Sequence, residues 1–248
     1  MKILFAGPSL SGTEFVPLRS NEDRLLPHLS LTCRGPAKCG DLTRAVDEGY
    51  NVIGLIDGRF EDVAAVWHKE ILYALSRGVT VLGAASMGAL RAAECHPFGM
   101  IGIGDVFARY AFGGLEDDAA VAQVHAPAEF GYTAFTEAMV TVDATLDAAL
   151  AASAIAPGEH ALIRDKANAV FFKDRSWAYI FDVLASDIVH AAERLKPFIR
   201  NVKRQDAQAL LKVLLEGKHP DEAKKSGAPL TGWLFNETTQ WQKLRAQH

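Results

Sequence analysis

The sequence has few cysteines, no excess of basic residues and no long apolar run, and each absence excludes a class of protein. Cys33, Cys39 and Cys95 are odd in number and lack the spacing of a metal site, which favours reduced thiols over a disulfide framework. The net charge of -4 provides no basic surface for a nucleic-acid backbone. No apolar stretch is long enough to cross a bilayer, and the start MKILFAG is too short for a signal sequence. We therefore expect a cytoplasmic protein that binds neither nucleic acid nor membrane.

Motifs for cofactors and metals are also missing. The glycines of residues 7–13 lack the Gly-Lys-Ser/Thr of a phosphate-binding loop, and those of residues 99–104 do not follow a predicted strand. The acidic run Glu116, Asp117 and Asp118 is typical of a solvated helix N-terminus. The sequence therefore predicts no cofactor and no metal ion.

What the chain does contain is an alternation of buried strands and helices. Four apolar segments predict strands, and helical patterns near residues 40–49, 62–77 and 87–95 lie between or after them; the segments are KILFAG, LSLTC, NVIGLID and VTVLGAA. This alternation predicts an α/β fold with a parallel sheet and flanking helices. After Gly104 most of the chain has helical spacing. We expect an α/β core over residues 1–155 and a helical C-terminal region over residues 156–248.

The most informative segment is GAASMG at residues 83–88, where a predicted strand ends and a helix begins. Small residues let the backbone bend there and hold the Ser86 hydroxyl at the carboxyl edge of the sheet, as in hydrolases with a serine nucleophile. The motif departs from Gly-x-Ser-x-Gly at Ala84, and a serine that merely caps the next helix uses the same residue types. We expect the N–H groups of Met87 and Gly88 to stabilise an oxyanion.

Two other loops are predicted at the same edge of the sheet. The loop after the second predicted strand carries Arg34 and Lys38, and the loop after the third carries Asp57 and Arg59. We expect the two arginines to bind substrate. Asp57 is expected either to orient a catalytic base or to accept backbone hydrogen bonds in a turn with Gly58.

A serine nucleophile needs a neighbour that accepts its proton, either a histidine or a lysine kept neutral by burial. Lys38 lies in a loop at the favoured edge, and His68 and Lys69 lie on the helix predicted after Asp57. With Asp62 as the N-cap, His68 falls on the apolar side of that helix and Lys69 falls toward the polar side. Inward histidines are also common in ordinary cores. The residues alone leave the identity of the base open.

Six blocks occur in an order that resembles the TfuA family, the trifolitoxin-synthesis type of protein that accompanies YcaO enzymes in ribosomal peptide modification. The blocks are FAGPSL, GPAKCGDL, IGLIDGRFE, VWHKEILYAL, GAASMGALRAAE and GMIGIGDVF. The resemblance covers about the first 145 residues. Separately, AASMGA is similar to the segment that holds the nucleophilic serine in the proteolytic subunit of Clp proteases.

The TfuA resemblance implies a partner of a YcaO enzyme in peptide backbone thioamidation, with the precursor peptide as a further partner. It implies that a serine and lysine pair hydrolyses the C-terminal thiocarboxylate of a small ThiS-like sulfur carrier and releases sulfide. Carried over to this sequence, the serine is Ser86. The lysine is Lys38, favoured by its loop, or Lys69, because both lie in matching blocks.

Two alternative functions stay open. A non-catalytic adaptor would dock on the YcaO enzyme and promote binding of its substrate peptide through a surface formed by Trp177, Tyr179, Phe181, Trp233 and Phe235, although aromatics of this kind also form ordinary cores. A hydrolase unrelated to sulfur is suggested by the Clp-like segment.

Overall fold

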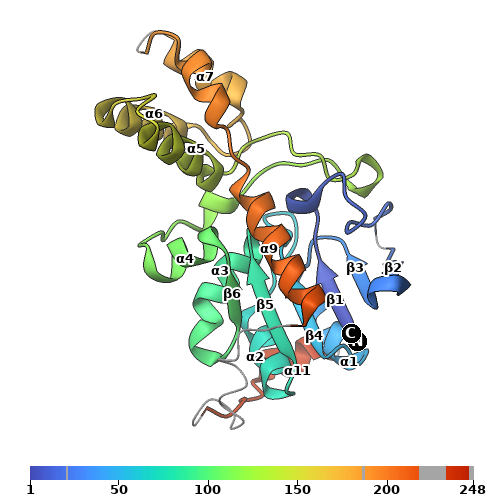
Figure 1. Ribbon diagram of the computed structural model, residues 1–248. Helices are drawn as coiled ribbons and strands as arrows, with labels where there is room; N and C mark the ends of the chain where they lie inside the picture. The colour runs from blue at the N-terminus through green and yellow to red at the C-terminus, as the bar shows by residue number, and fades with distance from the viewer. Residues whose placement is uncertain (21, 186–187, 218–232, 246–248) are drawn as a thin grey trace.

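A six-stranded sheet forms the centre of the molecule, with the strand order β2-β3-β1-β4-β5-β6 (Figure 1). The computed structural model describes residues 1–20, 22–185, 188–217 and 233–245. The strands are β1 (Lys2–Phe5), β2 (Arg24–Leu26), β3 (Leu31–Arg34), β4 (Val52–Leu55), β5 (Thr80–Ala84) and β6 (Ile101–Ile103). All neighbouring strands are parallel except β2 and β3, so the predicted α/β fold is confirmed.

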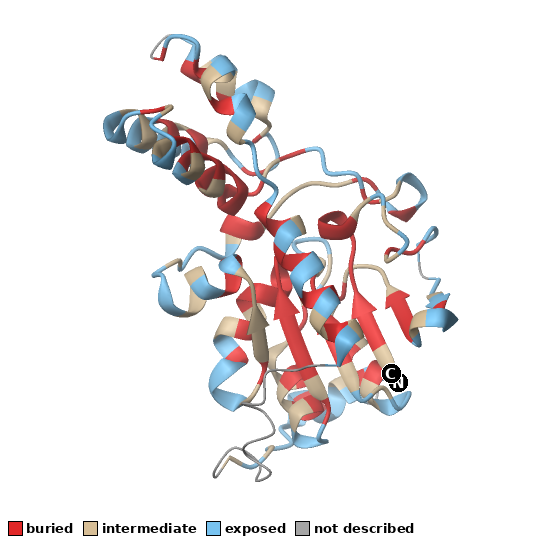
Figure 2. Ribbon diagram, viewed as in Figure 1, coloured by how far each residue is buried: buried red, intermediate tan, exposed pale blue. Residues whose placement is uncertain are grey.

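Helices cover both faces of the sheet. On one face, α1 (Asp41–Asp47), α2 (His68–Ser76) and α3 (Met87–Cys95) pack against strand residues that include Ile3 and Phe5. On the other face, α9 (Val202–Glu216) places Leu210 and Leu214 against a cluster that includes Leu4 (Figure 1). Alternate residues of β1 therefore point to opposite layers, and the central strands are buried on both sides (Figure 2).

Further helices form an arm beyond one end of the sheet (Figure 1). They are α5 (Met139–Ala151), α6 (Pro157–Ala169), α7 (Trp177–Leu184) and α8 (Ala191–Leu195). Outside the arm, α4 (Asp105–Phe112) packs against α3 and β6, and α11 (Thr239–Arg245) lies at the opposite end of the sheet. Short 3-10 helices connect these elements: η1 (Pro8–Leu10), η2 (Pro27–Leu29), η3 (His96–Phe98), η4 (Asp118–Val121), η5 (Ala128–Phe130) and η6 (Lys196–Phe198). In the described residues, no helix has both the length and the apolar character needed to cross a membrane.

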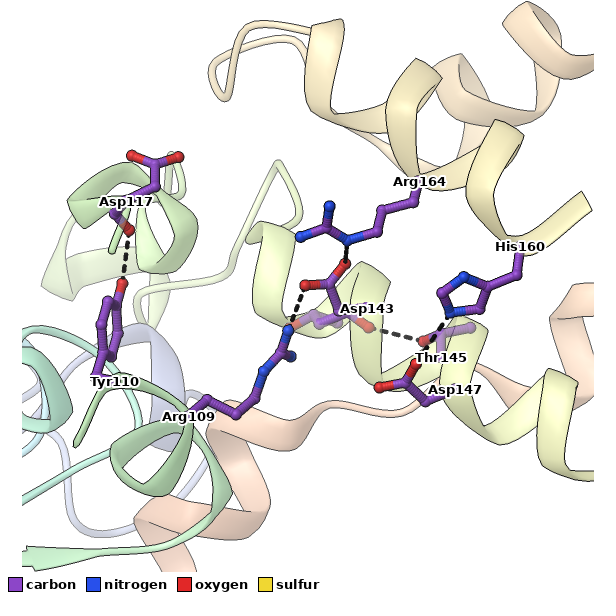
Figure 3. Close-up of polar contacts among 9 residues, drawn as sticks. Arg109, Tyr110, Asp117, Asp143, Thr145, Asp147, His160 and Arg164 are labelled. Carbon is purple, nitrogen blue, oxygen red and sulfur yellow. Dashed lines mark hydrogen bonds and ion pairs between the residues drawn. The ribbon is translucent and has the colours of Figure 1, made fainter. Parts of the chain in front are cut away.

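A buried carboxylate joins the arm to the rest of the molecule. Asp143 of α5 accepts hydrogen bonds from Arg109 of α4 at 2.5 Å and from Arg164 of α6 at 3.0 Å (Figure 3). Its side chain is 4% exposed, whereas both arginines reach solvent. One carboxylate therefore fixes three helices relative to one another.

Three local predictions are wrong. The edge strands β2 and β6 were not predicted, because three residues give no readable alternation. The helix predicted over residues 62–77 begins only at His68, so Asp62 is not its N-cap. The cap is made instead by the buried Glu70 carboxylate, which accepts a hydrogen bond from the Trp67 N–H at 3.0 Å.

Candidate active site

A cavity of about 780 Å³ opens at the carboxyl edge of the sheet, where the loops after β3, β4 and β5 meet. Its wall is completed by segments from η4 to Tyr132, by the connection between α6 and α7, and by α9. Six of the predicted site residues line it: Arg34, Lys38, Asp57, Arg59, Ser86 and Met87. The structure thus brings three separate loops to one space, in keeping with the rule for ligand sites in open parallel sheets.

Ser86 lies at the turn between β5 and α3. Ala85, the residue before it, has a φ of +67°, which is uncommon for a residue other than glycine. Ser86 stands at the N-cap position of α3, but its side chain makes no capping hydrogen bond. The hydroxyl is therefore not used as a helix cap, which was the structural alternative for this serine. Its side chain borders the cavity and is 8% exposed.

The two predicted oxyanion donors differ. In the described part of the chain no acceptor is recorded for the Met87 N–H, which lies beside the cavity at the first turn of α3. The Gly88 N–H donates to the Ile56 carbonyl at 3.0 Å, so the prediction that it holds an oxyanion is wrong. Gly88 serves instead as a contact point: a Cβ there would lie 1.8 Å from the Leu55 carbonyl oxygen, so only glycine lets α3 approach β4 this closely.

Asp57 lies two residues after the end of β4 and is fully buried. It accepts hydrogen bonds from the Gly7 N–H at 2.8 Å, the Ser9 N–H at 3.1 Å and the Ser9 hydroxyl at 2.7 Å. The expected turn with Gly58 is therefore wrong, because the donors come from the loop after β1. Asp57 holds that loop against the cavity.

Both predicted substrate-binding arginines reach the cavity but are already paired. Arg34 donates two hydrogen bonds to Asp23, each of 2.8 Å, and a third to Glu48 at 2.6 Å, and these carboxylates raise the pKa of its guanidinium. Arg59 forms an ion pair with Asp62. A substrate anion would compete with these carboxylates for either arginine.

Of the three predicted bases, only Lys38 lies at the cavity. Lys38 lines the cavity. Lys69 and His68 do not: the Lys69 amine lies 4.9 Å from the ring centroid of Phe235, and the His68 Nε2 lies 2.8 Å from Glu94. His68 is also 43% exposed in its side chain, so the expectation that it points inward is wrong. It is the first residue of α2, where the apolar stripe of the longer predicted helix does not apply.

Two other lysines line the cavity and were not predicted. Lys173, between α6 and α7, pairs with Glu61 at 2.6 Å and is 48% exposed in its side chain. Lys203 of α9 is 2% exposed, and burial lowers its pKa from 10.5 to about 8. A signal for Lys203 exists in the sequence, because it shares one face of a helical pattern with Ala207, Leu210 and Leu214.

One family model matches part of this chain. Residues 57–176 match the family model described as TfuA-like protein, which supports assignment of the chain to this family. The matched residues contain Asp57, Ser86, Met87 and Lys173, whereas Lys38 and Lys203 lie outside them. No curated protein matches the chain significantly.

Proposed function

We propose that this chain releases sulfide from the thiocarboxylate of a ThiS-like sulfur carrier and thereby serves a YcaO enzyme in peptide backbone thioamidation. The match of residues 57–176 to the TfuA-like family model supports a YcaO-associated role in general. The observation that carries the hydrolytic step is Ser86, a serine at a strand-to-helix turn whose hydroxyl borders a cavity without capping the helix.

The chemistry follows from the groups at the cavity. The Ser86 Oγ attacks the carbonyl carbon of the thiocarboxylate anion, and a neutral amine of the cavity takes the hydroxyl proton. The Met87 N–H donates to the developing oxyanion. The C–S bond breaks, the proton passes to sulfur, and hydrosulfide leaves an ester on Ser86. Water then hydrolyses the ester to the carrier carboxylate and regenerates the serine.

Sulfide release from a thiocarboxylated ThiS protein tests this proposal. Ser86→Ala is expected to slow release at least about 100-fold, because the nucleophile is lost. Ser76→Ala is the matched control, since that serine lies on α2 outside the cavity wall and donates to the Tyr73 carbonyl. In the wild type, mass spectrometry of quenched reactions should find the carrier acyl group on Ser86. An undiminished rate in Ser86→Ala would refute the covalent route.

Exposed apolar side chains on the arm favour the adaptor as a second candidate. Phe171, in the connection between α6 and α7, is 56% exposed, and Tyr179, in the first turn of α7, is 48% exposed. The other predicted docking aromatics are packed: Trp177 and Phe181 stack at 5.6 Å, Trp233 lies against Phe98, and Phe235 lies against Tyr73 and Trp241. The predicted five-residue docking surface is therefore reduced to Tyr179 and its neighbours.

One assay separates the two functions. If the chain is a non-catalytic adaptor, the wild type and Ser86→Ala support thioamidation equally well when free sulfide is supplied. If the chain is the proposed hydrolase, only the wild type supports thioamidation when the thiocarboxylated carrier is the sole source of sulfur.

A further inference from the structure

Tyr132 is a buried tyrosine whose hydroxyl makes no hydrogen bond within the described part of the chain. It lines the cavity and is 6% exposed. Among the same residues, the fully enclosed polar side-chain atoms without a partner are Thr43 Oγ1, Arg175 Nη1 and Trp177 Nε1, and the Tyr132 Oη is not one of them. The Oη therefore reaches the cavity. Buried tyrosine hydroxyls usually have a partner, so this one points to a group that binds in the cavity.

Two glycines give Tyr132 its place. A Cβ on Gly35 would lie 2.5 Å from the Tyr132 Oη, and a Cβ on Gly7 would lie 3.4 Å from the Tyr132 Cδ1. The ring therefore lies against the loops after β1 and β3, and its hydroxyl occupies the space of a side chain at residue 35. Tyr132 itself has a φ of +56°, which is uncommon for a bulky residue. Backbone strain of this kind is often found where a side chain serves function.

The Tyr132 hydroxyl is a neutral donor. Burial is the largest cause that raises the pKa of Tyr132, and the carboxylates of Glu129 and Asp57 raise it further, while Arg59 lowers it. At neutral pH the side chain therefore keeps its proton and offers one O–H donor.

The cavity wall around Tyr132 favours an uncharged ligand. Pro36 and Pro127 line the cavity, and the Pro127 carbonyl accepts a hydrogen bond from the Tyr132 N–H at 3.3 Å. The cation that acts on the hydroxyl through space, Arg59, is paired with Asp62. A main-chain peptide group is uncharged and accepts a hydrogen bond through its carbonyl, so it suits this part of the wall.

The strand order separates Tyr132 from Ser86. The Tyr132 Oη lies against Gly35 at the end of β3, Ser86 follows β5, and β1 and β4 lie between these two strands (Figure 1). Because neighbouring strands are about 4.8 Å apart, the two strand ends are roughly 14 Å apart. An extended chain covers this distance with about four residues. A peptide whose end reacts at Ser86 can therefore reach Tyr132 with an earlier residue.

From this arrangement we infer that Tyr132 binds the C-terminal tail of the sulfur carrier, an inference that rests on the proposed function. The tail lies extended across the strand ends, with its thiocarboxylate at Ser86. The Tyr132 hydroxyl donates to a main-chain carbonyl about four residues before the thiocarboxylate. Tyr132 thus favours substrates with a peptide tail, and it takes no part in the bond changes at the thiocarboxylate.

The test compares Tyr132→Phe with the wild type on a ThiS protein, since this change keeps the ring and removes only the hydroxyl. With the thiocarboxylated protein, KM is expected to rise about fivefold while kcat stays within about twofold, because one hydrogen bond to an unreacting part of the substrate is lost. With the ordinary carboxylate form, which needs no turnover, the Kd measured by calorimetry is expected to rise by about the same factor.

Tyr110→Phe is the matched control. The Tyr110 hydroxyl donates to the Asp117 carbonyl at 2.9 Å, and Tyr110 does not line the cavity, so KM and Kd should keep their wild-type values. The midpoint of urea unfolding separates binding from folding. It should fall in Tyr110→Phe, which loses a hydrogen bond within the protein, and stay unchanged in Tyr132→Phe, which loses none.

Two outcomes overturn the inference. They are KM and Kd within twofold of the wild type in Tyr132→Phe, and a fall in kcat at unchanged KM, which would place the hydroxyl at the reacting group. If Ser86→Ala loses sulfide release in either case, the proposed function stands without this role for Tyr132. If Ser86→Ala releases sulfide at the wild-type rate, the covalent route fails, and the Kd comparison still decides whether Tyr132 binds the tail.

Discussion

Replacing Lys203 by methionine should change how the stability of the protein depends on pH. Burial lowers the pKa of Lys203 from 10.5 to about 8 in the folded protein. Between these values the unfolded chain holds a proton that the folded chain has lost, so the free energy of unfolding rises with pH. The full effect is about 3 kcal/mol, because a tenfold change in a protonation equilibrium is worth about 1.4 kcal/mol. Methionine has a similar length and does not titrate, so this rise is absent in Lys203→Met.

The assay is urea unfolding, followed by tryptophan fluorescence, at pH 7.5 and pH 10. The difference in unfolding free energy between wild type and Lys203→Met should grow by about 2 kcal/mol between these two pH values, since most of the titration falls within them. Lys212→Met is the control for all other titrating groups, because Lys212 is exposed on the same helix. Equal pH dependence in the wild type and Lys203→Met would show that the buried amine does not titrate near pH 8.

Two further predictions concern packing and can be read from the same unfolding assay. Gly88→Ala should destabilise the protein by at least about 3 kcal/mol or prevent folding, because the new Cβ would lie 1.8 Å from the Leu55 carbonyl oxygen. The control is Gly158→Ala, which should change stability by less than about 0.5 kcal/mol because nothing lies within 4 Å of its new Cβ. Similar losses at both glycines would contradict the close approach. Asp143→Ala should cost about 3 kcal/mol, since it removes a buried carboxylate that pairs with both Arg109 and Arg164. Asp147→Ala should cost less than about 1 kcal/mol, because the Asp147 side chain is 66% exposed. Equal costs would mean that Asp143 does not join the arm to the sheet.

The centre of the fold could be predicted from the sequence because its strands are buried on both faces and read as continuous apolar runs. The edge strands β2 and β6 could not, because each is only three residues long, too short for an alternation to be read. The start of α2 was misplaced because partners distant in the sequence hold the segment before it. The Ala64 and Val66 carbonyls accept hydrogen bonds from the Cys39 N–H and the Arg91 side chain, so this segment is held by distant partners rather than by a helix.

The candidate site likewise contains residues that could be predicted from the sequence and one that could not. Ser86, Lys38 and Asp57 could be placed at one edge of the sheet because each directly follows a strand, and strand ends obey a simple rule. Lys203 follows no strand. Its two acceptors, Val121 and Gln123, are 82 and 80 residues away in the sequence. A lysine on the apolar face of a helix shows only that the residue is buried, and its place at the cavity depends on how α9 crosses the sheet.

The position of α9 has a consequence for the synthesis of this protein on the ribosome. β1 is made well before α9, yet the apolar layer around Leu4 is covered by Leu210 and Leu214, more than 200 residues later. The Lys2 amine likewise donates to the Leu214 carbonyl at 2.7 Å. Until α9 has been synthesised, one side of the nascent sheet stays open to water and to other chains, so chaperone binding during translation should concentrate on this side.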